Sequence, residues 1–128
     1  MRDISNSLAQ RGPVAWLEHF ATRPGFFMVS AGAVQFADRA AAETFLSKFT
    51  QTIGRVDLRW ADLRIEPLSP SLAMVGARYD EVMTKKDGGR LEFAGYFSGV
   101  FWHEESGWKV GHCHWSSPAD AAPAAASR

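Results

Sequence analysis

The chain has 128 residues, 14 basic and 14 acidic side chains, and a single cysteine, Cys113. This length fits one domain, the zero net charge argues against non-specific nucleic-acid binding, and one cysteine excludes an internal disulfide and a cysteine-based zinc site. Five Trp, nine Phe and two Tyr form a large aromatic set, which must fill a core, line a pocket or cover an interface.

The first predicted helix begins at Pro13, because proline suits the first helical turn, where its missing N–H costs no hydrogen bond. Trp16, Leu17 and Phe20 follow at helical spacing and form an apolar face that ends before a Pro-Gly pair. Residues 3–11 predict an earlier and weaker helical segment.

Two short strands, residues 26–30 and 33–36, are expected next, separated by Gly32. Asp38 then predicts a helix N-terminus, since an aspartate side chain accepts hydrogen bonds from the free N–H groups of the first turn. The apolar stripe of this helix and the glycine that closes it are Ala42, Phe45, Leu46, Phe49, Ile53 and Gly54.

The second half of the sequence predicts a sheet. Four long strands are separated by turn-forming Ser, Pro, Asp and Gly residues: 55–66, 72–86, 90–104 and 107–117. The apolar alternation of the first of these strands changes phase near Ala61–Asp62, which predicts a β-bulge. Helices followed by antiparallel strands indicate an α+β fold, with the helices on one face of a bent sheet.

The turns of the last two hairpins predict which side chains share a face. Two-residue loops at 105–106, and at 87–88 or 88–89, would set the register of these hairpins. One face of the sheet then carries Met74, Arg78, Asp80, Phe93, Phe97, Phe101, His112, His114 and Ser116. The opposite face then carries Val75, Ala77, Tyr79, Tyr96, Val100, Trp102, Cys113 and Trp115. A three-residue loop in the earlier hairpin would reverse this relation.

Both faces are rich in large apolar side chains, which a sheet with one solvated face would not show. We therefore expect one face to cover the helices and a pocket. The other is expected to meet a second copy of the chain in a homodimer, through Tyr79, Tyr96, Trp102 and Trp115.

The last strand, GWKVGHCHWS over residues 107–116, carries a Gly-Trp hairpin followed by His112, His114 and Ser116 in an H-x-H-x-S pattern. With the order of elements, this resembles the nuclear transport factor 2-like superfamily, and within it the SnoaL-like and calcium/calmodulin-dependent kinase association-domain branch. The resemblance covers roughly residues 10–117. It implies a cone-shaped curved sheet wrapped around N-terminal helices (a cystatin-like α+β barrel), with a pocket at its open end and a dimeric state.

The chain also departs from the patterns that this resemblance implies. Gly99 stands where the association-domain branch carries a pocket arginine. Ketosteroid isomerase-like members need a carboxylate just after the first helix, and no acidic residue occurs here between Glu18 and Asp38. Anion binding and isomerase chemistry in those familiar forms are therefore not expected.

Eight residues are candidates for contacting a ligand in the pocket: Trp16, Phe20, Trp60, Arg78, Asp80, Phe97, His112 and His114. Arg78 would suit a carboxylate, or would form an ion pair with Asp80 or Asp62. The aromatic residues also suit plain core packing.

Three functions remain open. The first is a dimer that binds a small, partly apolar molecule. The second is a SnoaL-like isomerase, cyclase or hydrolase of a polyketide- or terpene-like substrate, in which His112 or His114 exchanges protons with Asp80. The third is an oligomeric assembly module. No metal site is expected, because two histidines on a strand supply fewer ligands than a closed site needs, and no cofactor is expected either.

We expect residues 1–117 to form the domain and the Ala/Pro-rich residues 118–128 to be a disordered tail, since they offer no large apolar side chain to bury. The first twenty residues lack the apolar core of a signal peptide, and no stretch is long and apolar enough to span a membrane. The expected location is the cytoplasm.

Overall fold

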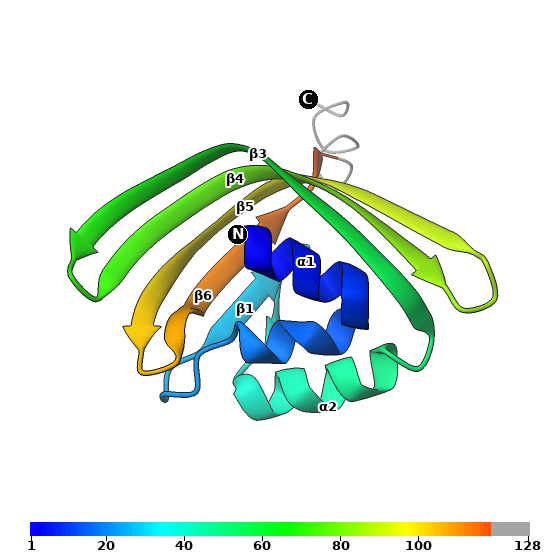
Figure 1. The fold of residues 1–128 in the computed structure, drawn as a ribbon, viewed down its shortest axis with the longest axis horizontal. Coiled ribbons are helices and arrows are strands. Elements are labelled where there is room, and N and C mark those ends of the chain that lie inside the picture. Colours follow the sequence, from blue (N-terminus) through cyan, green and yellow to red (C-terminus); the bar gives the residue numbers. More distant parts are fainter. Residues whose placement is uncertain (119–128) are drawn as a thin grey trace.

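The computed structural model of the chain describes residues 1–118, so the predicted tail lies almost wholly outside the described residues. The helices are α1 (Arg2–Arg11), the 3-10 helix η1 (Pro13–Glu18) and α2 (Arg39–Phe49). The strands are β1 (Phe27–Ser30), β2 (Ala33–Phe36), β3 (Ile53–Ser69), β4 (Leu72–Lys85), β5 (Arg90–Glu104) and β6 (Gly107–Ser116). Figure 1 shows the helices lying beneath the concave side of a long, bent sheet.

The predicted α+β class is confirmed, and the sheet is curved but not closed. Its six strands lie in the order β2-β1-β6-β5-β4-β3. All neighbours are antiparallel except β1 and β6, which run parallel, so the sheet is mixed rather than purely antiparallel. The N-terminal hairpin thus joins the C-terminal strand, and residues far apart in sequence meet there. No helix among residues 1–118 is long and apolar enough to cross a membrane.

The helices form where the sequence predicts them, with two differences. The segment that begins at Pro13 is a 3-10 helix, and it ends at Glu18. Asp38 caps α2 as expected, since its carboxylate accepts a hydrogen bond from the backbone N–H of Ala41 at 2.8 Å. However, α2 ends at Phe49, and Ile53 is instead the buried first residue of β3.

The predicted bulge in β3 is confirmed, and it resets the side of the sheet to which the later side chains of that strand point. The pairing of β3 with β4 shifts between Ala61 and Arg64, and Asp62 has a φ angle of 53°. One extra residue in β3 therefore resets the alternation. As a result Ile65, which pairs with Val75, points to the same side of the sheet as Trp60, which pairs with Tyr79.

Two other registers differ from the prediction, and both move side chains to the opposite face. Between β4 and β5 the loop has three residues, because the N–H of Lys85 donates to the carbonyl of Gly89 and Thr84 pairs with Arg90. Odd-numbered residues of β4 therefore face odd-numbered residues of β5. Between β5 and β6 the predicted pairing of Glu104 with Gly107 is correct, but the register shifts between Val100 and Phe101.

The shift in β6 lies at Gly111, which has no partner in the pairing of β5 with β6. Beyond it Gly99 pairs with Cys113 and Phe97 with Trp115, rather than with His112 and His114 as predicted. Because side chains alternate along a strand, this one-residue shift turns Cys113 and Trp115 inward and the two histidines outward.

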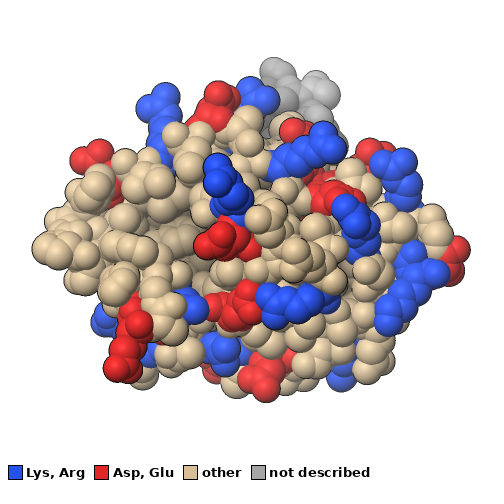
Figure 2. All heavy atoms as spheres, viewed as in Figure 1, with Lys and Arg blue, Asp and Glu red and all other residues tan. Residues whose placement is uncertain are grey.

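The core lies between the concave face of the sheet and the helices. The large side chains that it buries include Leu8, Trp16, Phe20, Phe36, Leu46, Val56, Tyr79, Phe97, Val110 and Cys113. Figure 2 shows that basic and acidic side chains are interspersed over the face in view, with no extended patch of one sign.

Candidate functional site

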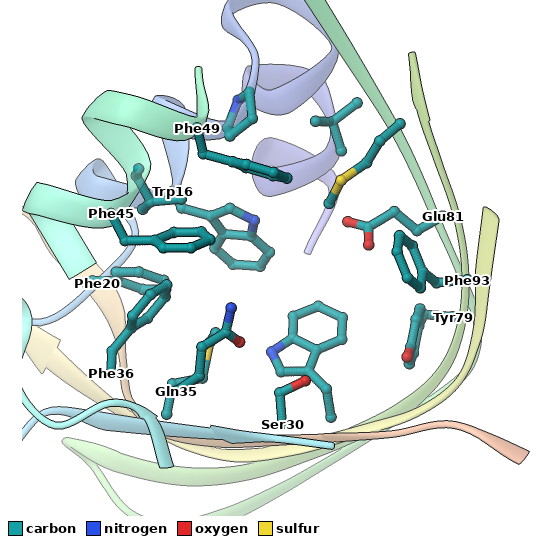
Figure 3. A pocket seen from close by; sticks show the side chains of 16 residues that line it. Trp16, Phe20, Ser30, Gln35, Phe36, Phe45, Phe49, Tyr79, Glu81 and Phe93 are labelled. Carbon is teal, nitrogen blue, oxygen red and sulfur yellow. The ribbon is translucent and has the colours of Figure 1, made fainter. Parts of the chain in front are cut away.

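A cavity of about 240 Å³ opens between the concave sheet and the helices η1 and α2. This volume is slightly below the range of roughly 300–1,000 Å³ found for small-molecule sites, so the cavity fits a small ligand. Figure 3 shows its lining. The principal side chains are Trp16, Phe20, Ser30, Gln35, Phe36, Phe45, Phe49, Tyr79, Glu81, Phe93 and Trp115.

Aromatic rings form a continuous wall around much of the cavity. On the helical side the sequence of ring contacts runs from Phe49 through Phe45 and Phe36 to Phe20, with centroids 5.2, 5.4 and 6.4 Å apart. It continues from Phe20 to Trp16, which stack at 5.4 Å. Such a wall of π faces suits a planar or a cationic ligand.

The wall continues onto the sheet through Trp115. Its ring meets that of Trp16 edge to face at 5.7 Å and that of Tyr79 at 4.9 Å. Phe45 is 41% exposed and Phe93 is 44% exposed, although both line the cavity. These two rings therefore mark where the cavity meets solvent.

Glu81 is the one acidic side chain among the described residues that line the cavity. It lies on β4 between Leu58 of β3 and Phe93 of β5, and only 9% of it is exposed. In Figure 3 its carboxylate points into the cavity from the sheet side, across from Phe45, Phe20 and Phe36. Its position is thus that of a polar anchor in an apolar site.

The carboxylate of Glu81 has no partner within the described part of the chain, whether a hydrogen-bond donor or a cation. Burial raises its pKa from 4.5 to about 7, because the charged form loses its hydration without compensation. Near neutral pH this side chain therefore exists in both its protonated and its ionised form, and it can give or accept a proton.

The other polar groups of the cavity are uncharged. The Tyr79 hydroxyl donates to the carbonyl oxygen of Ser116 at 3.2 Å, and Ser30 and Gln35 line the opposite side. The indole N–H groups of Trp60 and Trp115 are buried and donate to no acceptor in residues 1–118. Neither nitrogen is therefore exposed to solvent in the empty cavity.

Of the eight residues predicted to contact a ligand, Trp16 and Phe20 line the cavity. Trp60 and Phe97 lie behind it: their rings are 5.2 Å apart, and both pack on Trp115, at 5.8 and 4.7 Å. They support the wall of the cavity without forming its surface.

The prediction that Arg78, Asp80, His112 and His114 face the pocket is wrong, because the two register differences place all four on the outer face of the sheet. Arg78 forms an ion pair with Asp62 at 3.3 Å, one of the alternatives considered for it. The ring of His112 packs against that of Phe27 with centroids 4.1 Å apart and planes tilted by 31°, and its Nδ1 lies 3.3 Å from the carbonyl oxygen of Phe27.

The proposed exchange of protons between a histidine and Asp80 is also excluded by the register. His112 aligns across the sheet with Met74, and His114 with Gly76, which lie six and four residues along β4 from Asp80. At about 3.3 Å per residue these separations are roughly 20 Å and 13 Å, too long for direct proton transfer. In the described residues no group of three or more His, Cys, Asp or Glu side chains is placed to hold a metal ion.

The predicted dimer surface is divided between the two faces. Tyr79 and Trp115 point inward and line the cavity, whereas Tyr96 and Trp102 remain on the outer face. Trp102 is half-buried there, since the guanidinium of Arg23 lies 4.5 Å from its ring.

The sequence reasoning missed Glu81, together with Tyr79 and Trp115 as parts of the cavity. One signal was available in β4, where Val75, Ala77, Tyr79 and Met83 alternate as apolar residues and Glu81 interrupts the series. An acidic residue at an otherwise apolar period-two position indicates a buried carboxylate, once that face is known to point inward.

Comparison with solved structures shows the same fold in many proteins. An NTF2-like superfamily protein from Salmonella enterica is 19% identical, with a TM-score of 0.70, over 89% of this chain and 82% of that one. A protein from Novosphingobium aromaticivorans, provisionally described as a scytalone dehydratase, has a TM-score of 0.76 at 15% identity, over 91% and 78% of the two chains.

An NTF2-like protein of unknown function from Shewanella oneidensis has a TM-score of 0.64 at 16% identity, over 91% of this chain and 92% of that one. At these identities the likeness concerns the fold alone. No curated protein gave a sequence match. The family model of the SnoaL-like domain matches residues 5–120, nearly the whole chain, and the protein therefore belongs to the SnoaL-like family of the NTF2-like fold.

Proposed function

We propose that the chain binds a small, mostly apolar molecule in the cavity between the sheet and the helices, with Glu81 as its polar anchor. The observation that carries this proposal is the combination of a continuous aromatic wall with one inward-pointing, unpaired carboxylate. A carboxylate that is buried for structural reasons normally has a partner, because burying it alone is costly. A ligand supplies the missing partner.

A thermal-shift series tests this proposal with a variant that fills the cavity. Ser30 lies on β1 with its side chain in the cavity, and Ser30→Phe should occupy part of the space. Val34→Phe, on the exposed surface of the neighbouring strand β2, is the matched control. A ligand at 100 times its dissociation constant should stabilise the native chain and the control by about 2.7 kcal/mol.

Small aromatic compounds with neutral, cationic and anionic substituents serve as probes. Stabilisation of the native chain and of Val34→Phe, but not of Ser30→Phe, supports binding in the cavity. Stabilisation that survives in Ser30→Phe places the binding elsewhere, and no stabilisation by any probe at millimolar concentration contradicts the proposal.

An enzyme is the second candidate, and the pKa of Glu81 favours it. A carboxyl group with a pKa of about 7 can act as a general acid and as a general base near neutral pH. Glu81 then takes the place of the histidine–aspartate pair in an isomerase, cyclase, hydrolase or dehydratase.

NMR of a bound β-hydroxy aryl ketone tests this second candidate. If the compound loses water in the presence of the native chain but not of Glu81→Gln, the chain is an enzyme. Recovery of the compound unchanged argues for binding alone.

We also propose that the chain forms a homodimer through the outer face of the sheet. On that face four residues of adjacent strands are paired in a row across the sheet: Met74, Val100, His112 and Phe27. Met74 is 53% exposed and Phe27 is 39% exposed. An apolar row of this kind suits a self-complementary interface.

Light scattering after size exclusion tests the dimer. The expected mass is twice the chain mass of 14.1 kDa, and Phe27→Glu should reduce it to that of one chain. A monomeric native chain contradicts this proposal. A mass well above that of a dimer supports the assembly-module alternative instead.

A further inference from the structure

The cavity contains an anionic group but no positive charge. Among its described lining residues, only Glu81 and Tyr79 carry a dissociable proton. None of the described side chains that face Glu81 from η1, β1, β2, α2, β3, β5 or β6 is a lysine, arginine or histidine. The site therefore lacks the group that would neutralise an ionised Glu81 inside the chain.

The remaining surface of the cavity also favours a positive charge. The faces of Trp, Tyr and Phe rings carry partial negative charge and attract cations, and seven such rings form an uninterrupted series of contacts from Phe49 to Tyr79. An anionic ligand would meet both these ring faces and the carboxylate, and would be repelled by both.

From the unpaired carboxylate and the ring wall we infer that the ligand of this cavity is an organic cation, an ammonium group attached to an apolar body, with the nitrogen beside Glu81 and the body against the aromatic wall. This inference rests on the proposed binding function and specifies the ligand class of that same site. The cation forms a buried ion pair with the Glu81 carboxylate. The ring faces replace the water around the ammonium group and attract its charge, which offsets part of the cost of removing it from water.

Binding of a permanent cation is coupled to the ionisation of Glu81. Because burial raises the pKa of this carboxyl to about 7, the empty site holds a proton in about half of the molecules at neutral pH. The ammonium group displaces that proton. Affinity for the cation therefore increases about tenfold per pH unit between pH 5 and pH 6 and levels off above pH 8, where Glu81 is already ionised.

Isothermal titration calorimetry with three probes of similar shape tests the inference: phenyltrimethylammonium, the neutral tert-butylbenzene and the anionic benzenesulfonate. The cation should bind at least ten times more tightly than the neutral probe at pH 8, and the anion should not bind. At pH 7 in buffers of different ionisation enthalpy, binding of the cation should release about half a proton per site, whereas binding of the neutral probe should release none.

Two variants assign the effect to Glu81. Glu81→Gln should lose at least tenfold in affinity for phenyltrimethylammonium and keep its affinity for tert-butylbenzene, which also shows that the cavity is intact. Glu66→Gln makes the same change at an exposed position on β3 and should alter neither affinity.

The outcomes separate this inference from the proposed function. Preference for the cation, lost in Glu81→Gln, supports both. Equal or tighter binding of the neutral probe, abolished by Ser30→Phe, overturns the cation inference and leaves the binding function standing. Failure of all three probes to bind overturns the cation inference, and the wider probe series with Ser30→Phe then decides the binding function.

Discussion

Tyr79 and Glu81 extend from the same face of β4 into one cavity, but they differ in how their polar groups are satisfied. The Tyr79 hydroxyl donates to the carbonyl oxygen of Ser116, whereas the Glu81 carboxylate has neither a donor nor a cation among residues 1–118. An ionised carboxylate without a partner is costly to bury. Glu81 therefore lowers the unfolding free energy of the protein without ligand. Residues that serve a binding site commonly have such a cost in stability.

Glu81→Gln should stabilise the protein at high pH. The pKa of Glu81 is about 7 in the folded chain and 4.5 ordinarily, so the folded state binds this proton more tightly than the unfolded state does. The unfolding free energy consequently falls as the pH rises from about 4.5 to about 7, and the full loss, roughly 3 kcal/mol, is reached above pH 7. The variant carries no such loss.

Urea denaturation of the native chain, Glu81→Gln and Glu66→Gln between pH 4.5 and pH 8.5 measures this effect. The stability difference between Glu81→Gln and the native chain should grow over that range by roughly 3 kcal/mol, while Glu66→Gln should follow the native chain. A difference that does not change with pH would show that Glu81 is hydrated or paired in solution.

The elements of the fold were predictable because they depend on local patterns. Asp38, as an N-cap residue, predicts the start of α2. Alternating apolar residues predict the strands β3 to β6, and the turn-forming residues between these strands predict where each one ends. The pairing of β1 with β6 was not predictable in this way. It joins Phe27 to His112, 85 residues apart, and no local signal selects a partner at that distance.

The candidate site depended on single-residue differences in register. One additional loop residue before Gly89 reverses which side chains of β4 share a face with those of β5, and one unpaired residue, Gly111, turns residues 112–116 over relative to β5. Trp16 and Phe20 were placed correctly, because their helical segment does not depend on those registers. Histidines and acids on the strands were placed on the wrong face, and for the same reason Glu81 was overlooked.

Gly111→Ala should destabilise the protein. A Cβ atom at this position would lie 2.2 Å from the ring of Trp102, which packs across the bulge, so the ring or the strand must move. We expect a loss of about 1–3 kcal/mol in unfolding free energy, as for other overpacked sites. The control is Gly54→Ala, where the nearest atom is in the flexible side chain of Lys86 at 3.4 Å and the loss should be much smaller. Equal stability of the two variants would contradict the packing of Trp102 on Gly111.

Glu104→Gln should loosen the segment that precedes β1. The Glu104 carboxylate accepts hydrogen bonds from the backbone N–H groups of Thr22 and Arg23, from the Thr22 hydroxyl and from the indole of Trp102. Burial opposes ionisation of Glu104, but the hydrogen bonds outweigh it and lower the pKa. Because the folded pKa is lowered, this stabilisation is complete above the ordinary pKa of 4.5 and is lost as the pH falls below it.

The expected loss in Glu104→Gln is about 1 kcal/mol at pH 7, since several charge-assisted hydrogen bonds are weakened at a partly exposed site. It should shrink when urea denaturation is repeated near pH 3. Glu105→Gln, the exposed neighbour in the β5–β6 turn, serves as the control and should leave stability unchanged. A loss in Glu104→Gln that is as large at pH 3 as at pH 7 would argue that the carboxylate does not anchor this segment.

Cys113 should be unreactive in the folded protein. Its side chain is fully buried opposite Gly99, and burial raises the pKa of the thiol to about 12. Thiol reagents attack the thiolate, so both access and ionisation oppose the reaction. In Ser106→Cys, which adds an exposed thiol in the β5–β6 turn, Ellman's reagent at pH 8 should modify one thiol rapidly and the second only as fast as the protein unfolds. In urea both should react at once. Rapid reaction of Cys113 in the native chain would mean that β6 is not held in the register that turns Cys113 and Trp115 toward the core.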